Sequence, residues 1–155
     1  AYMLLKGKGV EKDYNRSLFW YIVAAEQGDG EAQNSVGILY ELGIGTVQSL
    51  SEAFYWYTES SNSGYTPAFN RLAYFYLMGK GVDKDIHKAI ELFKKAASKG
   101  DQTAIEVLDI LDPEDKLGKG LLRKIGEIVL DEAINLLGEE IGGYLSEAIA
   151  NRQKQ

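Results

Sequence analysis

Residues 68–103 have the sequence AFNRLAYFYLMGKGVDKDIHKAIELFKKAASKGDQT, and this stretch decides the fold. Moved back by 36 positions it matches residues 32–67, and moved back once more it matches the beginning of the chain. The recurring positions include three glycines and one aromatic residue per copy: Gly79, Gly43 and Gly7; Gly81, Gly45 and Gly9; Gly100, Gly64 and Gly28; Phe93, Tyr57 and Tyr21. A fixed period of this length is typical of arrays in which each repeat stacks on its neighbours. The sequence therefore predicts a repeat array.

Each repeat has the pattern of two helices joined by a turn. Apolar residues at helical spacing predict that the first helix of the second repeat runs from Glu31 to Leu42, with Asp29 as its N-cap. The second helices of the three repeats follow Asp13, Ser49 and Asp85, which are residue types that cap helix N-termini.

The boundaries of the first helices carry further signals. Thr66 precedes Pro67, and proline is favoured at the first helical position, so we expect Thr66 to be the N-cap of that helix. Gly43 and Gly79 follow the last apolar residue of their helices, where a left-handed turn needs a residue without Cβ. A fourth first helix, over residues 102–111, keeps only part of the pattern, so the array is expected to end in a partial repeat.

Residues 113–155 lie outside the repeat. Apolar residues keep helical spacing from position 119 to position 141, and charged residues occupy the other face, which predicts an amphipathic helix. Charged residues recur too often for a membrane span. The predicted fold is an all-α superhelix, or solenoid, of 36-residue helix-turn-helix repeats over residues 1–112, followed by a C-terminal helical extension.

Composition argues against several classes of function. The chain has no cysteine, and its formal net charge of −6 disfavours binding to nucleic acid. Its one histidine, His87, stands where the other repeats have Asn15 and Ser51, so we expect a solvated side chain without a catalytic partner. The Gly-X-Gly turns recur at the repeat period and lack the strand that precedes a phosphate loop. We therefore expect no enzymatic activity, no bound metal and no cofactor.

The recurring pattern resembles that of the Sel1-like repeat family, a relative of the tetratricopeptide repeats. In the second repeat, the residues that carry the resemblance are Ala32, Gly37, Tyr40, Gly43, Gly45, Ala53, Trp56, Tyr57 and Gly64. The resemblance extends to about residue 112. It implies an α-solenoid with a right-handed twist and a role as an adaptor or scaffold for other proteins, without catalysis. Many members are bacterial, and many of those are exported.

The chain starts in the middle of a repeat, because Ala1 corresponds to Gly37. We therefore expect it to be a fragment of a longer protein whose first repeat is truncated, and its cellular location is left open.

In tetratricopeptide-like arrays the first helices line the concave face, and the resemblance implies that a partner protein binds there. The residues expected to point into this face are Tyr2, Leu5, Glu31, Asn34, Ile38, Glu41, Asn70, Tyr74 and Leu77. Asn34 and Asn70 occupy the same position in consecutive repeats, and their carboxamides can bind the backbone of a peptide. The apolar members would form a groove for a peptide or a helix. The alternative is that both asparagines are merely tolerated on an exposed surface.

The amphipathic C-terminal helix has three candidate roles. The first expectation is a cap on the last repeat, because the end of an array needs a cover. The helix could instead occupy the concave face of its own chain, or pair with a second copy in a homodimer through residues 119–151. The predicted function is a protein-interaction module that binds a partner through its concave face. The alternative is a structural element in which the C-terminal helix mediates self-association or blocks the groove.

Overall fold

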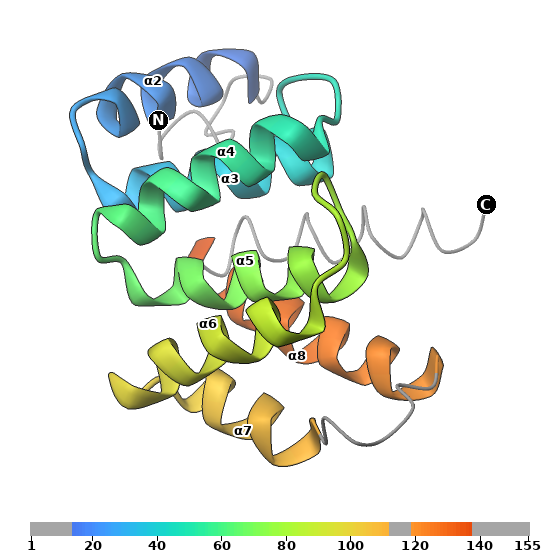
Figure 1. The fold of residues 1–155 in the computed structure, drawn as a ribbon. Helices are drawn as coiled ribbons and strands as arrows, with labels where there is room; N and C mark the ends of the chain where they lie inside the picture. The colour runs from blue at the N-terminus through green and yellow to red at the C-terminus, as the bar shows by residue number, and fades with distance from the viewer. Residues whose placement is uncertain (1–13, 112–118, 138–155) are drawn as a thin grey trace.

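The computed structural model of the chain describes residues 14–111 and 119–137. This part of the chain contains seven helices and no strand (Figure 1). The helices are α2 (Tyr14–Glu26), α3 (Gly30–Leu42), α4 (Leu50–Asn62), α5 (Thr66–Met78), α6 (Ile86–Ser98), α7 (Gln102–Ile110) and α8 (Lys119–Leu137). Helices α3, α5 and α7 are the first helices of successive repeats, and α2, α4 and α6 are the second helices. The predicted all-α array is therefore confirmed.

Most predicted helix starts are confirmed at the level of single hydrogen bonds. Asp29, Ser49 and Asp85 each accept a hydrogen bond from a backbone N–H in the first turn of the helix that follows, at 3.0–3.2 Å. These bonds satisfy N–H groups that have no partner within the helix. The prediction for Asp13 falls outside the described residues.

The prediction for Thr66 was wrong by one residue. Helix α5 begins at Thr66 itself, and Tyr65 is the N-cap, without a hydrogen bond from its side chain. Pro67 is thus the second helical residue, where an N–H also lacks a partner within the helix. For this reason the proline does not force the boundary to lie at the residue before it.

The turns after α3 and α5 have the expected left-handed residue. Gly43 has a φ of 68° and Gly79 a φ of 69°, and their N–H groups donate to Leu39 O and Phe75 O of the preceding helix. The chain can therefore reverse direction in the same way in both repeats.

The core lies between consecutive helices along the array. Tyr57, Phe75 and Phe93 are fully buried, and the rings of Tyr57 and Phe75 meet edge to face with centroids 5.3 Å apart. Gly37 lies directly against Tyr57, because a Cβ added at Gly37 would stand 2.5 Å from a carbon of the Tyr57 ring. Position 37 therefore needs glycine where the next repeat has Ala73.

Helix α8 packs against α5 and α7. Figure 1 shows α4 and α6 on the near side of the array and α8, in orange and red, passing behind α5. The helix begins at Lys119, as predicted, and is described to Leu137; the rest of the predicted extension lies outside the described residues. The contacts of α8 thus include the first helices of two successive repeats, and its role as a cap, as an occupant of the concave face or as a dimerisation helix stays a prediction.

Candidate functional site: the first-helix face

The surface formed by α3, α5 and α7, here called the first-helix face, is where a partner was predicted to bind. Helix α8 lies on part of it. Its residues Ile125, Val129 and Ala133 recur every four positions and are at most 1% exposed. Such a stripe is the apolar face of an amphipathic helix.

The structure places most of the predicted partner-binding residues in the interior. Asn34, Ile38, Glu41, Asn70 and Leu77 are buried, Tyr74 is half-buried, and Glu31 in the first turn of α3 is exposed. Tyr2 and Leu5 lie outside the described residues. The predicted residues are therefore not an open surface in this structure, and those on α5 lie on the helix that α8 covers.

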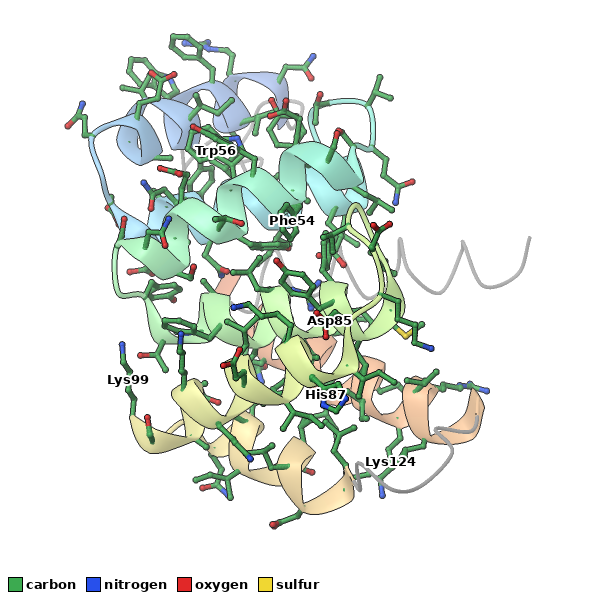
Figure 2. The ribbon with its side chains drawn as sticks, viewed as in Figure 1. Phe54, Trp56, Asp85, His87, Lys99 and Lys124 are labelled. Carbon is green, nitrogen blue, oxygen red and sulfur yellow. The ribbon has the colours of Figure 1, made fainter. Side chains whose placement is uncertain are left out.

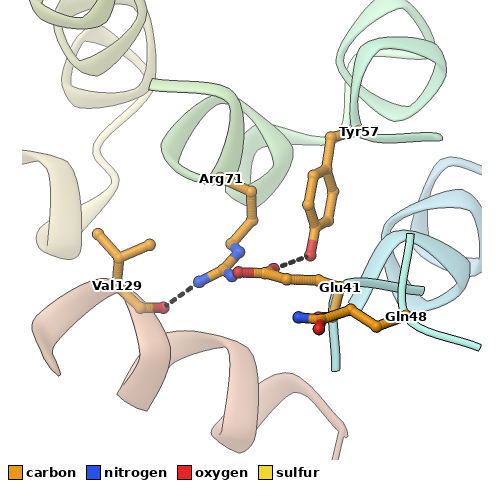
Figure 3. A network of polar contacts seen from close by, with 5 residues as sticks. All are labelled: Glu41, Gln48, Tyr57, Arg71 and Val129. Atoms are coloured by element: carbon orange, nitrogen blue, oxygen red, sulfur yellow. Dashed lines mark hydrogen bonds and ion pairs between the residues drawn. The ribbon is translucent and has the colours of Figure 1, made fainter. Parts of the chain in front are cut away.

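A buried charge pair joins α3 to α5 and reaches α8 (Figure 3). The Arg71 guanidinium forms an ion pair with the Glu41 carboxylate, and the Tyr57 hydroxyl donates to the same carboxylate at 2.6 Å. Arg71 Nη1 donates to the backbone carbonyl of Val129, in the middle of α8, at 3.3 Å. The side chain of Gln48 donates to the Glu41 backbone carbonyl at 2.8 Å. One cation therefore connects two repeats and the C-terminal helix.

The surroundings of this pair favour the charged form of Arg71 and the protonated form of Tyr57. Burial alone would lower the pKa of Arg71, but the neighbouring Glu41 carboxylate outweighs burial, and the net shift is upward. Burial raises the pKa of Tyr57 well above its usual value, and the Glu41 carboxylate raises it further. Tyr57 therefore stays protonated and acts as a hydrogen-bond donor. The Arg71–Glu41 pair links structural elements, and the Tyr57 hydroxyl adds a hydrogen bond to it.

A second polar cluster lies at Asn70. Its Nδ2 donates to Asp101 Oδ1 at 2.9 Å and to the Glu132 carboxylate of α8 at 2.9 Å and 3.2 Å. Asp101 is also the N-cap of α7, accepting from the N–H of Ala104 at 2.9 Å. The Asn70 carboxamide therefore binds side-chain carboxylates of its own chain, and its binding to the backbone of a partner peptide stays a prediction.

The Glu132 carboxyl is perturbed by this environment. Burial raises its pKa, hydrogen bonds from Asn70 and Thr103 oppose the rise, and the nearby Asp101 adds to it. The pKa of Tyr65 is raised to about 12, first by burial and then by the charges of Glu31, Glu132 and Asp29.

Tyr74, an aromatic residue of the first-helix face, packs closely on α8. A Cβ added at Gly126 would lie 2.9 Å from the Tyr74 hydroxyl, a distance that real Cβ atoms do not show. Gly126 therefore lets α8 approach Tyr74 without a side chain between them. Two cations also lie near the Tyr74 ring: Arg71 Cζ at 5.9 Å and Lys80 Nζ at 5.0 Å from its centroid.

The candidates for catalysis or metal binding among the described residues are the one histidine and the acidic side chains. His87 is exposed at the start of α6, as expected (Figure 2). Within residues 14–111 and 119–137, no group of three His, Asp or Glu side chains could hold a metal ion. In the same part of the chain, no helix is long and apolar enough to cross a membrane.

Sequence reasoning missed three residues that matter here: Arg71, Gly126 and Glu132. A signal existed for Arg71, because it is an arginine in the interior of a helix, beside the apolar residues Leu72 and Ala73. One repeat earlier, Glu41 is an acid at a position that is leucine in the other repeats. No comparable signal existed for the two residues of α8, because a helix outside the repeat has no register to copy.

Comparison with known proteins agrees with this architecture. The model of the Sel1 repeat matches residues 1–29, 30–65 and 67–101. A crystal structure of a Sel1 repeat protein from Oxalobacter formigenes is similar, with a TM-score of 0.62 and 35% identity over 66% of this chain and 42% of that one. A protective antigen of uropathogenic Escherichia coli with this fold has a TM-score of 0.65 and 24% identity over 97% of this chain and 32% of that one. The chain thus spans less than half the length of either structure. A comparison with curated proteins gives no match. Because the matched repeats cover more than half of its residues, the chain belongs to the Sel1 repeat family.

Proposed function

We propose that this chain is a protein-interaction module whose first-helix face binds an amphipathic helix, and that α8 occupies the face when no partner is bound. Sel1 repeat proteins are generally scaffolds for protein interactions. The observation that carries the proposal is the burial of Ile125, Val129 and Ala133 of α8 against α5 and α7. A face that holds one amphipathic helix in this way has the shape and polarity to hold another.

The polar contacts indicate the chemistry of a suitable partner. Arg71 offers a donor to a backbone carbonyl, and Asn70 offers donors to a carboxylate. The surface beside Tyr74 has room only for a glycine, as at Gly126 of α8. The partner helix would therefore carry an aliphatic stripe, a glycine facing Tyr74 and an acidic residue two turns further on, as Gly126 and Glu132 do in α8.

Occupation of the first-helix face by α8 would make partner binding depend on the release of α8. A partner can use the face only in the fraction of molecules in which α8 has left it, so the apparent affinity falls by that fraction. Partner binding and blocking of the groove by the C-terminal helix would thus occur in the same molecule, because α8 competes with the partner for the first-helix face.

A peptide experiment tests the proposal. Val129→Asp places a charge in the buried stripe and should release α8, whereas Lys124→Asp introduces the same charge at an exposed position of α8 (Figure 2). A fluorescein-labelled peptide of residues 119–137 should bind the Val129→Asp chain at least tenfold more tightly than the wild type, since one buried charge costs more than about 1.4 kcal/mol. The Lys124→Asp chain should behave as the wild type.

Two outcomes would contradict the proposal. The first is a Val129→Asp chain that keeps its repeat helices, by circular dichroism, and does not bind the peptide. The second is equal binding by all three proteins. If Val129→Asp loses its helices, Gly126→Leu provides a second release, because the three atoms nearest to an added Cβ all belong to Tyr74. Light scattering of the released chains tests self-association: a concentration-dependent dimer would favour exchange of α8 between two copies.

A further inference from the structure

A groove lies on the other side of the array, between the second helices α4 and α6, with α5 as its floor. Its cavity volume is about 710 Å³, within the range of about 300–1,000 Å³ typical of ligand sites. Phe54, Phe69 and Tyr76 are half-buried in its walls, and Leu92 lies at its base. Figure 2 shows Phe54 beneath α4 and Lys99 at the C-terminal end of α6.

The charge of the groove is opposite to that of the whole chain. Lys88, Lys95 and Lys99 line it together with neutral residues only, although the chain has a formal net charge of −6. Lys88 lies 3.6 Å from the exposed carboxylate of Glu91, and no described carboxylate lies within 4.0 Å of Lys95 or Lys99. The Lys99 ammonium lies 5.0 Å from the centroid of the Phe69 ring. Positive charge and aromatic surface therefore meet in one place.

The corresponding positions one repeat earlier show that the fold does not require lysines beside an aromatic surface. At the places of Lys88, Lys95, Lys99 and Leu92, the preceding repeat has Glu52, Glu59, Ser63 and Trp56. Trp56 is half-buried and packed against the core. The third repeat thus has lysines in place of two acids and a serine, and a leucine in place of the larger tryptophan.

We infer that this groove binds an acidic peptide segment that carries one aromatic or aliphatic side chain. The ammonium groups of Lys95 and Lys99 would pair with its carboxylates, and the apolar side chain would enter between Phe54, Tyr76 and Leu92. The net negative charge of the chain disfavours general binding of such a peptide, whereas the lysines of the groove favour it. This site is independent of the first-helix face, because it is built from the opposite side of α5 and from α4 and α6.

The test uses two fluorescein-labelled peptides, one with a phenylalanine between runs of Glu and Asp, the other with Gln and Asn in place of the acids. Lys95→Glu combined with Lys99→Glu should weaken binding of the acidic peptide at least about tenfold, because two attractions become repulsions. Lys84→Glu combined with Lys94→Glu changes the net charge equally at exposed lysines that do not line the groove, and should have little effect. Leu92→Trp should also weaken binding, because it fills the groove as Trp56 does one repeat earlier.

Circular dichroism first establishes that each variant keeps its helices. The Leu92→Trp variant is expected to fold, because the preceding repeat has Trp56 at the corresponding position. Equal loss in the two lysine pairs, or equal affinity for the acidic and the neutral peptide, would overturn the inference. So would binding to vesicles of anionic phospholipid that depends on Lys95 and Lys99 while the acidic peptide does not bind, since the groove would then serve a membrane surface. Val129→Asp should leave this affinity unchanged, which separates the two sites.

Discussion

The ion pair between Arg71 and Glu41 allows a prediction in which the chain supplies its own reference. One repeat further on, the positions of Glu41, Tyr57 and Arg71 are occupied by Leu77, Phe93 and Val107, all of them buried. The same junction between repeats is thus built once with a charged network and once with apolar side chains. Replacing Glu41, Tyr57 and Arg71 by leucine, phenylalanine and valine therefore removes the charged network and introduces a set of core side chains that the chain already uses.

The single substitution Glu41→Leu leaves the buried Arg71 charge without its carboxylate. Removal of one partner of a buried ion pair lowers the free energy of unfolding by about 3–5 kcal/mol, a large part of the about 5–15 kcal/mol typical of a domain. Replacing both charges by apolar side chains is often neutral. The pair Glu41→Leu with Arg71→Val should then lose only about 1–3 kcal/mol, because the buried Tyr57 hydroxyl has no acceptor. Adding Tyr57→Phe should remove most of that loss.

Urea unfolding followed by circular dichroism measures these differences, and the slope with urea shows whether the transition remains comparable between variants. The triple variant should still lose protection of α8 amides in hydrogen exchange, because Val129 O has lost its donor. A loss of less than about 1 kcal/mol for Glu41→Leu alone, or a triple variant destabilised by the sum of the single changes, would show that the charged network does not act as one unit.

Three further predictions concern packing and charge in the same region. Gly37→Ala should lower the melting temperature, because the new Cβ would stand 2.5 Å from a Tyr57 ring carbon; an unchanged melting temperature would show that the ring can move at no cost. Because burial raises the folded-state pKa of Glu132, the native chain holds this proton more tightly than the unfolded chain does. Stability relative to Glu132→Gln should therefore fall as pH rises from the unfolded pKa of about 4.3 to the higher folded pKa. Urea unfolding of both proteins at several pH values measures this, and a pH-independent difference would contradict it. Asn70→Ala should cost about 1–3 kcal/mol, because the carboxylates of Asp101 and Glu132 lose a shared donor, and a loss below about 0.5 kcal/mol in urea unfolding would show that water replaces it.

The repeat array could be predicted from sequence because its signals are local and recur. The spacing of Gly43 and Gly79 and the caps at Ser49 and Asp85 each fix a helix end without reference to distant residues. The one error in a cap, at Thr66, arose because proline is tolerated throughout the first helical turn.

The candidate site was predictable only in part, because it depends on contacts between distant residues. Repeat register placed Asn70 and Glu41 on the first helices, but it could not show that they are buried. Burial of Glu41 follows from an arginine 30 positions later, and burial of Asn70 follows from a helix that the repeat does not contain. The amphipathic pattern of α8 predicted that it covers some surface, and packing decides which one.

A spin label on α8 would show where this helix lies in solution. Because the chain has no cysteine, Glu127→Cys on the exposed side of α8 gives a single site for a nitroxide spin label. We predict that the label broadens amide signals of α5 as well as α7 within the same molecule, and broadens those of α4 less. A mixture of labelled chain and isotope-enriched unlabelled chain should show no broadening. Broadening confined to α7 would indicate a terminal cap, and broadening in the mixture would indicate a dimer; either result would contradict the account.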